Sequence, residues 1–161
     1  MRVAILTLSD CGYAGRREDQ SGPAIKGLVE QAGLQVVHTG LLPDDRAALA
    51  GELRRLCDNK LADLILTTGG TGFSPTDQTP EATMDVVERP VPGIPEAMRW
   101  YSLQITPRAM LSRAAAGIRG GTLIVNLPGS PKAAEECLGF ILPTLSHGVE
   151  ILKGTVGECA R

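Results

Sequence analysis

The chain has 161 residues, of which 43% are hydrophobic and 21% are charged, and this balance excludes wholesale disorder. Its formal net charge is −2 and its 16 Lys and Arg residues are scattered, which argues against a nucleic-acid partner. A chain of this length suits one domain, and we predict a single domain over residues 1–161.

The N-terminal apolar stretch ends before Ser9 and Asp10, so it is too short for a signal peptide or a membrane span. The four cysteines form no CxxC pair, and neither histidine has metal-ligand spacing. Cys57 falls within an amphipathic helix pattern and is predicted to be a small core residue. We therefore expect a cytoplasmic protein with no zinc site and no membrane association.

The first elements alternate between a short apolar run and helical spacing. Residues 2–8 predict a strand, and residues 9–20 predict a polar loop. A helix is expected over residues 21–31, with Ser21 as its N-cap and Gly33 as its stop signal.

The next unit repeats this order. Residues 34–42 predict a second strand, and either Asp44 or Asp45 is placed to cap the helix that follows. That helix carries leucines at helical spacing along one face. They are Leu49, Leu53 and Leu56.

The third strand is expected over residues 61–67, where apolar residues are continuous. Such a run is typical of a parallel strand that is covered on both faces. Farther along, Thr79 resembles an N-cap with Pro80 at the first helical position.

Prolines divide the segment 91–121, within which a helix over about residues 95–104 is predicted. Residues 122–127 form a clear buried strand, and Ser130 is placed to cap another helix. The segment after Pro143 is expected to be helical as well. The resulting fold class is α/β, a three-layer sandwich with a mostly parallel central sheet.

Two of these strands end in glycine-rich turns that lead into capped helices. The first turn lies in TTGGTGFSPTDQTPEAT, residues 67–83, and the second in NLPGSPKAAEE, residues 126–136. In parallel sheets, ligands bind outside the carboxyl ends of the strands, where helix N-termini and exposed amides favour an anion such as phosphate. Each turn alone could serve only to reverse the chain. Neither a P-loop GxxxxGK[ST] nor a complete GxGxxG is present, which disfavours a Walker-type NTPase and a Rossmann dehydrogenase.

Asp77 lies beside the first glycine turn, where a carboxylate would repel a bound phosphate unless a cation intervened. Mg²⁺ binds through one or two carboxylates together with substrate phosphates. Asp44 is the best second acid for this purpose, and Asp10 is a third. Asp45 is better explained as a helix cap.

Five segments in order carry a resemblance to a known family. TTGGTG, TDQTPEAT, GIPEAMR, LSRAAAG and NLPGSPKA together resemble the molybdopterin adenylyltransferase family, the MogA/MoaB-like proteins. The resemblance covers nearly the whole chain. It implies a compact α/β domain that adenylylates molybdopterin with Mg²⁺ and ATP, releasing pyrophosphate before molybdate insertion. It also implies a homotrimer, or a hexamer in some MoaB-like proteins, and handover to a molybdate-inserting protein.

The resemblance also implies roles for individual residues. Asp77 and Asp44 correspond to the catalytic acids that hold Mg²⁺ through ATP, while Cys11 departs from the basic or small polar residue expected after Asp10. Glu96 and Arg99 could form an ion pair that fixes their segment. The residues implied to bind the nucleotide and the pterin are Ser9, Asp10, Thr68, Gly69, Gly70, Thr71, Gly72, Ser112, Arg113, Pro128, Gly129 and Ser130.

A second class of function stays open at this point. A protein of the same fold could bind molybdopterin without adenylylating it, as a non-catalytic binding or scaffold protein of the MoaB type. The acid in TDQTPEAT is the feature that distinguishes the two interpretations, and this chain retains it. An adenylyltransferase is therefore the favoured prediction.

Overall fold

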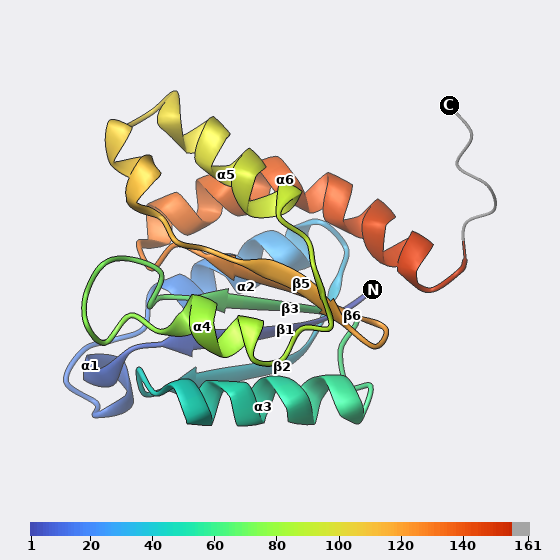
Figure 1. Cartoon of the computed structure of the whole chain (residues 1–161), viewed down its shortest axis with the longest axis horizontal. Helices are drawn as coiled ribbons and strands as arrows, with labels where there is room; N and C mark the ends of the chain where they lie inside the picture. Colours follow the sequence, from blue (N-terminus) through green and yellow to red (C-terminus); the bar gives the residue numbers. More distant parts are fainter. Residues whose placement is uncertain (156–161) are drawn as a thin grey trace.

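The computed structural model describes residues 1–155, in which a six-stranded sheet lies between two layers of helices (Figure 1). The strand order is β2-β1-β3-β6-β5-β4. The strands are β1 Arg2–Leu8, β2 Gln35–Leu42, β3 Leu64–Thr68, β4 Arg89–Pro90, β5 Ala116–Arg119 and β6 Thr122–Leu127. The helices are α1 Asp10–Tyr13, α2 Ser21–Gln31, α3 Arg46–Asp58, α4 Thr79–Met84, α5 Gly93–Leu103, the 3-10 helix η1 Pro107–Leu111 and α6 Pro131–Leu152. None of these helices is long and apolar enough to cross a membrane.

Each face of the sheet has its own hydrophobic core, because side chains along a strand alternate between the two faces. In β1, Val3 and Ile5 pack on the side covered by α2, α5 and α6. Ala4 and Leu6 pack on the opposite side, covered by α3 and α4. Four strands, β2, β1, β3 and β6, pair in parallel, and β5 and β4 add an antiparallel edge. The predicted three-layer, mostly parallel α/β architecture is confirmed.

The connections around β1 create the crevice that matters for function. From β1 the chain passes through α2 to β2 on one side, and then through α3 to β3 on the other side of β1. Ligands of open α/β sheets bind outside the carboxyl ends of strands at such a reversal. The loops that follow β1 and β3 therefore meet at the expected binding edge.

Several predicted boundaries need correction. The third strand begins at Leu64 and not at residue 61, because Asp63 turns its carboxylate to Arg2 and Leu61 is partly exposed. The loop predicted over residues 9–20 contains the short helix α1, which Ser9 caps through the Gly12 N–H. The short elements β4, β5 and η1 were not predicted. Helix α6 continues through Pro143 as one helix.

Two predicted caps are wrong. Ser21 is the first residue of its helix, and Gln20 is the N-cap; Asp19, one residue earlier, accepts from the N–H groups of Ser21 and Gly22 through Oδ1 at 3.0 and 3.1 Å. Thr79 likewise makes no cap; its hydroxyl donates to the Gly69 carbonyl. The caps at the start of α3 and of α6 are confirmed, since Asp45 accepts from the Ala48 N–H at 2.7 Å and Ser130 caps α6.

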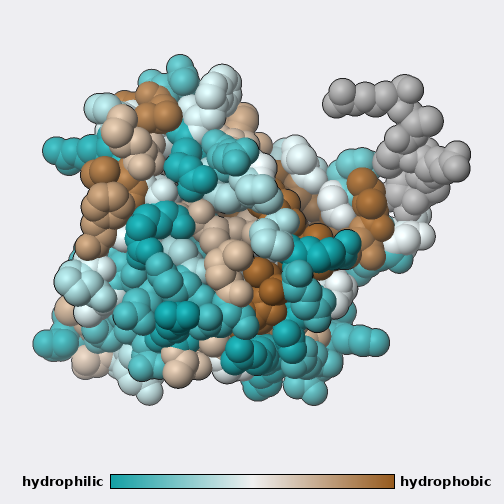
Figure 2. All heavy atoms as spheres, viewed as in Figure 1, coloured by the Kyte–Doolittle hydropathy of each residue, from teal (hydrophilic) through white to brown (hydrophobic). Residues whose placement is uncertain are grey.

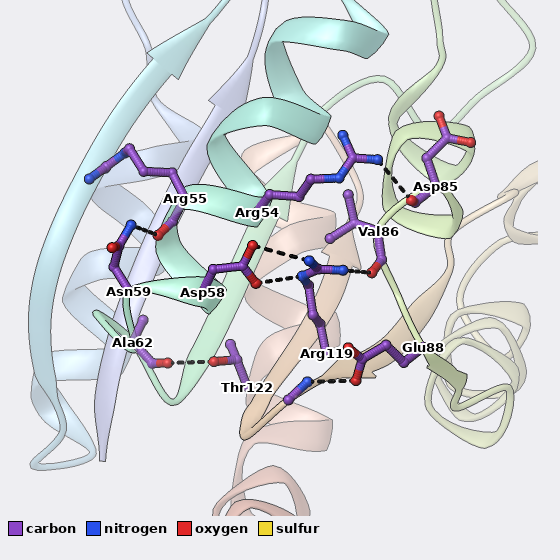
Figure 3. A network of polar contacts seen from close by, with 11 residues as sticks. Arg54, Arg55, Asp58, Asn59, Ala62, Asp85, Val86, Glu88, Arg119 and Thr122 are labelled. Carbon is purple, nitrogen blue, oxygen red and sulfur yellow. Dashed lines mark hydrogen bonds and ion pairs between the residues drawn. The ribbon is translucent and has the colours of Figure 1, made fainter.

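The β5–β6 hairpin is tied to the helices on one face by a polar network around Arg119 (Figure 3). The Arg119 guanidinium binds both carboxylate oxygens of Asp58 at 2.8 and 3.1 Å and the Val86 carbonyl at 3.1 Å. Thr122 adds a hydrogen bond of 2.8 Å to the Ala62 carbonyl. Thr122 is the first residue of β6, so this network stabilises the sheet at the end away from the crevice.

A second ion cluster joins the start of β1 to the end of α6. Asp63 is 3% exposed, and its carboxylate binds Arg2 Nη2 and Lys153 Nζ, each at 2.9 Å, and the Arg2 N–H at 2.7 Å. Burial on its own raises the pKa of Asp63, but the hydrogen bonds from Arg2 and Lys153 outweigh it and hold the pKa well below the ordinary value. The charged carboxylate therefore stabilises the folded state.

We expect Asp63→Asn to lower the free energy of unfolding by about 2–3 kcal/mol at pH 7, because a nearly buried ion cluster loses its central charge. A carboxyl group whose pKa is depressed on folding stabilises fully above its unfolded pKa, here 3.8, and progressively less below it. The gap between the wild type and the variant should therefore shrink by about 1 kcal/mol at pH 3. Urea unfolding at pH 7 and pH 3 measures this difference in stability. An equal difference at both pH values would contradict the stabilising role of the charged Asp63 carboxylate.

Candidate functional site

The loop after β3 crosses the end of β1 at very short range. Gly69 has φ +96°, and a Cβ atom built on it would lie 2.3 Å from the Leu8 carbonyl oxygen. Gly70 follows with φ +64°. Left-handed backbone of this kind favours glycine, and no side chain fits between the loop and β1 at Gly69. The two consecutive glycines are therefore required by the crevice itself.

The predicted acids Asp10 and Asp44 hold each other in place at the crevice. The Asp10 N–H donates to Asp44 Oδ2 at 3.0 Å, and the Asp44 N–H donates to Asp10 Oδ1 at 2.9 Å. Burial raises the pKa of Asp44, the bond from the Asp10 N–H lowers it, and the negative charges of Asp10 and Asp77 raise it further. The net effect is a raised pKa of Asp44, mainly because of burial, with a smaller contribution from the charges of Asp10 and Asp77.

Asp77 reaches the same region from the loop after β3. Its Oδ2 accepts from the Ser74 N–H at 3.0 Å and lies 2.9 Å from the position of a Cβ on Gly72. Within residues 1–155, no ion pair involves Asp10, Asp44 or Asp77, whereas Asp58, Asp63, Asp85 and Glu81 are all paired with arginine. None of these three acids therefore has a protein cation to balance its charge within the described residues.

This donor set fits a hard divalent cation. Carboxylate oxygens are the ligands that Mg²⁺ prefers, and it takes one or two of them when phosphates supply other ligands. Asp44 and Asp77 each keep an oxygen that forms no hydrogen bond within the described part of the chain. Within residues 1–155, no three or more His, Cys, Asp or Glu side chains are arranged to hold a metal ion by themselves, so substrate phosphates would have to supply the other ligands.

A polar cavity of about 130 Å³ opens beside the glycine turn. It lies where the ends of β1 and β3 meet the start of α2 and the second glycine turn. Hydroxyl groups link its walls: Ser21 donates to the Gly129 carbonyl at 2.9 Å, and Thr68 donates to the Pro128 carbonyl at 2.7 Å. The residues that line it include Thr7, Ser9, Arg17, Asp19, Ser21, Thr68, Gly69 and Gly129.

A larger cavity of about 280 Å³ lies on the other side of the same turn, next to α5 and η1. Its lining is mostly apolar, which suits a flat organic ring. The lining includes Thr71, Gly72, Met98, Ala109, Leu111, Ser112, Ala114, Pro128 and Cys137. Two cavities of different character therefore flank residues 69–72.

Not all of the predicted site residues lie where a ligand could contact them. Most of them line one of these cavities or are the acids Asp10, Asp44 and Asp77. Ser130 serves as the cap of α6, and its hydroxyl is 3.5 Å from the Ala133 nitrogen. Arg113 aims its side chain at the loop after β3, where it binds the carbonyls of Gly72 and Asp77 at 2.7 and 2.5 Å. It also pairs with Glu81.

The proposed ion pair between Glu96 and Arg99 does not form. Arg99 instead donates to the carbonyls of Ser112 and Ala114 at 3.3 and 3.2 Å, which ties α5 to the segment that carries Arg113. Asp19 lines the polar cavity; the family resemblance includes it as a retained residue of GRREDQSGP, but it was not among the predicted binding residues. Glu81 was missed, and its position in TDQTPEAT was the available signal.

Comparison with known proteins identifies a family and several relatives of this chain. A family model described as a probable molybdopterin binding domain matches residues 4–147. The chain is 40% identical to a molybdopterin adenylyltransferase of Helicobacter pylori over 156 residues, which cover 96% of this chain and 89% of that protein. It is 39% identical to a molybdopterin adenylyltransferase of Escherichia coli, over 86% of this chain and 72% of that protein. The crystal structure of the molybdopterin biosynthesis enzyme MoaB from Thermus thermophilus matches with a TM-score of 0.90 and 47% identity, over 95% of this chain and 96% of that one.

Proposed function

This chain belongs to the molybdopterin-binding domain family, and on that premise we propose that it is a molybdopterin adenylyltransferase of molybdenum cofactor biosynthesis. The reaction joins molybdopterin to the adenylyl group of ATP and releases pyrophosphate. The observation that carries the proposal is the group of unpaired acids beside a glycine turn that separates two cavities. A reaction that joins two substrates needs two binding cavities that open onto the same group of side chains.

In the proposed reaction, a phosphate oxygen of molybdopterin attacks the α-phosphorus of ATP. The new P–O bond forms as the bond to the bridging oxygen of the β-phosphate breaks, so that pyrophosphate leaves with the electron pair. The protein needs no nucleophile of its own, because positioning and charge stabilisation supply the catalysis. The amides of residues 70–72 would receive phosphate oxygens, and the two cavities would hold the two substrates on either side.

Asp44 and Asp77 are the residues that would hold Mg²⁺ on the nucleotide phosphates. When bound, the cation would neutralise charge that develops on the leaving pyrophosphate. Asp44 is kept in position by the N–H of Asp10, and Asp77 by the N–H of Ser74. Both carboxylates can therefore be held without reorganising a loop at each turnover.

The experiment that tests the function is the assay of adenylylated product from the purified chain, molybdopterin, ATP and Mg²⁺. Product formation with release of pyrophosphate is expected. Tight molybdopterin binding without product would favour the non-catalytic binding or scaffold function. Because the product awaits molybdate, we also propose handover to a molybdate-inserting protein, and we expect ATP as co-substrate to confine the reaction to the cytoplasm.

We further propose that the chain assembles as a homotrimer, with a hexamer as the larger alternative. The support is a group of exposed apolar side chains on α5, η1, the turn between them and α6, including Trp100 at 60% and Met110 at 64% exposure. Figure 2 shows hydrophobic residues at the corner of the molecule where α5 and η1 meet. Surface of this kind marks an interaction site. The remaining members are Leu103, Ile105, Leu111 and Phe140.

Sedimentation of the purified chain is expected to give a species of three chains, and Trp100→Glu should shift it toward the single chain, because a charge in an apolar interface is costly. Val37→Glu is the matched control, since Val37 is also exposed and apolar but lies on β2. A wild-type chain that sediments alone at micromolar concentration would refute the assembly.

A further inference from the structure

The carbonyl groups of the first glycine turn all point into the protein. The carbonyls of Gly69 and Gly70 accept hydrogen bonds from Thr79. The Thr79 hydroxyl donates to the Gly69 carbonyl at 2.9 Å, and the Thr79 N–H donates to the Gly70 carbonyl at 3.1 Å. Thr79 is 3% exposed, so both bonds are shielded from water. This residue fixes the first half of the turn.

Arg113 fixes the second half in the same manner. Its N–H donates to the Thr71 carbonyl at 2.9 Å, and its Nε donates to the Gly72 carbonyl at 2.7 Å. Its Nη2 donates to the Asp77 carbonyl at 2.5 Å, which extends the hold to the predicted catalytic acid. Three of the five N–H donors of the guanidinium are therefore directed at protein groups, since Nη1 is paired with Glu81.

Glu81 fixes Arg113 in turn. Burial on its own raises the pKa of Glu81, but the hydrogen bond and charge of Arg113, together with the Glu81 N–H and the charge of Arg46, outweigh it and lower the pKa. Its second oxygen, Oε2, is buried and has no partner among the described residues. Arg113 is the ion-pair partner of this carboxylate within residues 1–155, and this pairing keeps the guanidinium from turning outward.

The direction of the carbonyls determines the direction of the amides. Residues 1–155 contain no cis peptide bond, and in a trans peptide the C=O of one residue and the N–H of the next point in opposite directions. Four carbonyls in succession, from Gly69 to Gly72, bind Thr79 or Arg113. The four N–H groups that follow them therefore point away from these two residues. Within the described part of the chain, these amides, of Gly70, Thr71, Gly72 and Phe73, have no hydrogen-bond acceptor.

We propose that Thr79 and Arg113 are positioning residues that turn the amides of residues 70–73 outward to receive the phosphates of the nucleotide. This inference rests on the proposed function and assigns Arg113 a role different from the one implied by family resemblance. Successive N–H groups that point the same way in a turn form an anion-binding concavity, and the left-handed Gly69 and Gly70 begin this one. Arg113 acts through the loop, and its charge is directed at carbonyls and at Glu81 and not at the substrate.

The test measures binding of MgATP to the full chain by calorimetry, without turnover. Thr79→Val keeps the shape of the buried side chain but removes the donor to the Gly69 carbonyl, and we expect a Kd about tenfold higher. Thr79→Ser restores the hydroxyl and should return the Kd to within about twofold of the wild type. Thr83→Val is the matched control, because Thr83 is fully buried in the same helix but binds Asn126 and not the turn. It should change the Tm and leave the Kd unchanged.

Arg113→Lys separates a positioning role from a direct contact with phosphate. Lysine keeps the charge but cannot reach the three acceptors that the planar guanidinium binds, so a positioning role predicts a Kd about tenfold higher. A near-normal Kd in Arg113→Lys, or in Thr79→Val, would overturn the proposal. A Kd as weak in Thr79→Ser as in Thr79→Val would do the same, because the hydroxyl would then not be the cause.

Failure of this inference can be told apart from failure of the proposed function. A wild-type chain that binds MgATP but forms no adenylylated product argues against the enzyme and leaves the binding comparison intact. An unchanged Kd in the variants, together with product formation by the wild type, argues against the positioning role alone. Wild-type protein that does not bind MgATP would overturn both.

Discussion

Asp77→Asn is expected to lower kcat for adenylyl transfer by about 10²–10³-fold, because the variant loses a preorganised charge next to the reacting phosphates. The variant should still fold. Asparagine can accept the hydrogen bond from the Ser74 N–H, and Arg113 holds residue 77 through its backbone carbonyl, which the change does not touch. Binding of molybdopterin should stay within about twofold of the wild type, since the predicted partner of this acid is the cation on the nucleotide.

Asp45→Asn is the matched control for this variant. Asp45 lies next to Asp44, but its side chain caps α3 by accepting from the Ala48 N–H at 2.7 Å. Asparagine is as good an N-cap as aspartate, so the control removes one negative charge near the site without disturbing the helix. Near-normal turnover by a folded Asp77→Asn chain, or an equal loss in both variants, would rule out a specific role for Asp77.

Gly69→Ala is expected to destabilise the fold by about 3 kcal/mol. Left-handed backbone costs an L-residue about 1–2 kcal/mol, and a clash with rigid backbone adds a similar amount. The added Cβ would meet the Leu8 carbonyl oxygen at 2.3 Å, where neither partner is a flexible side chain. The crevice between β1 and β3 would have to widen, so MgATP binding should weaken as well. Urea unfolding and calorimetry measure the two effects.

Gly120→Ala isolates the part of this loss that comes from backbone conformation. Gly120 also has a positive φ, +54°, but a Cβ atom added there would have no neighbouring atom within 4 Å. The control should therefore cost about 1–2 kcal/mol and leave nucleotide binding unchanged. Equal losses in the two variants would mean that close approach to β1 is not what requires glycine at position 69.

The sequence predicted the parts of this fold that depend on local pattern. Continuous apolar runs identified β1 and β6, because a strand buried on both faces is apolar at every position. The spacing of Leu49, Leu53 and Leu56 identified α3, because a helix buried on one face is apolar at regular intervals. The short edge strands were missed. β4 has two residues and β5 has four, and they are strands only because the sheet is there to pair with.

Prediction of the site met a similar limit. The glycine turns and the acids stood out because their residue types are rare in such spacing. The roles of Thr79 and Arg113 could not be identified in this way, since a hydroxyl after a turn resembles an N-cap and an arginine near a predicted phosphate resembles a ligand. What decides each role is the carbonyl that the side chain meets, and Arg113 lies more than thirty positions from the groups it binds.

The two reciprocal hydrogen bonds between Asp10 and Asp44 couple the opening motions of their segments. Each backbone N–H binds the carboxylate of the other residue, so neither bond can open without loosening the segment that supports its counterpart. The start of α1 and the end of β2 should therefore open as one cooperative unit, and their two amides should exchange with solvent at similar rates. A cation that stabilised the Asp44 carboxylate would slow both rates together, so that the state of the site could be followed from amides that touch no substrate.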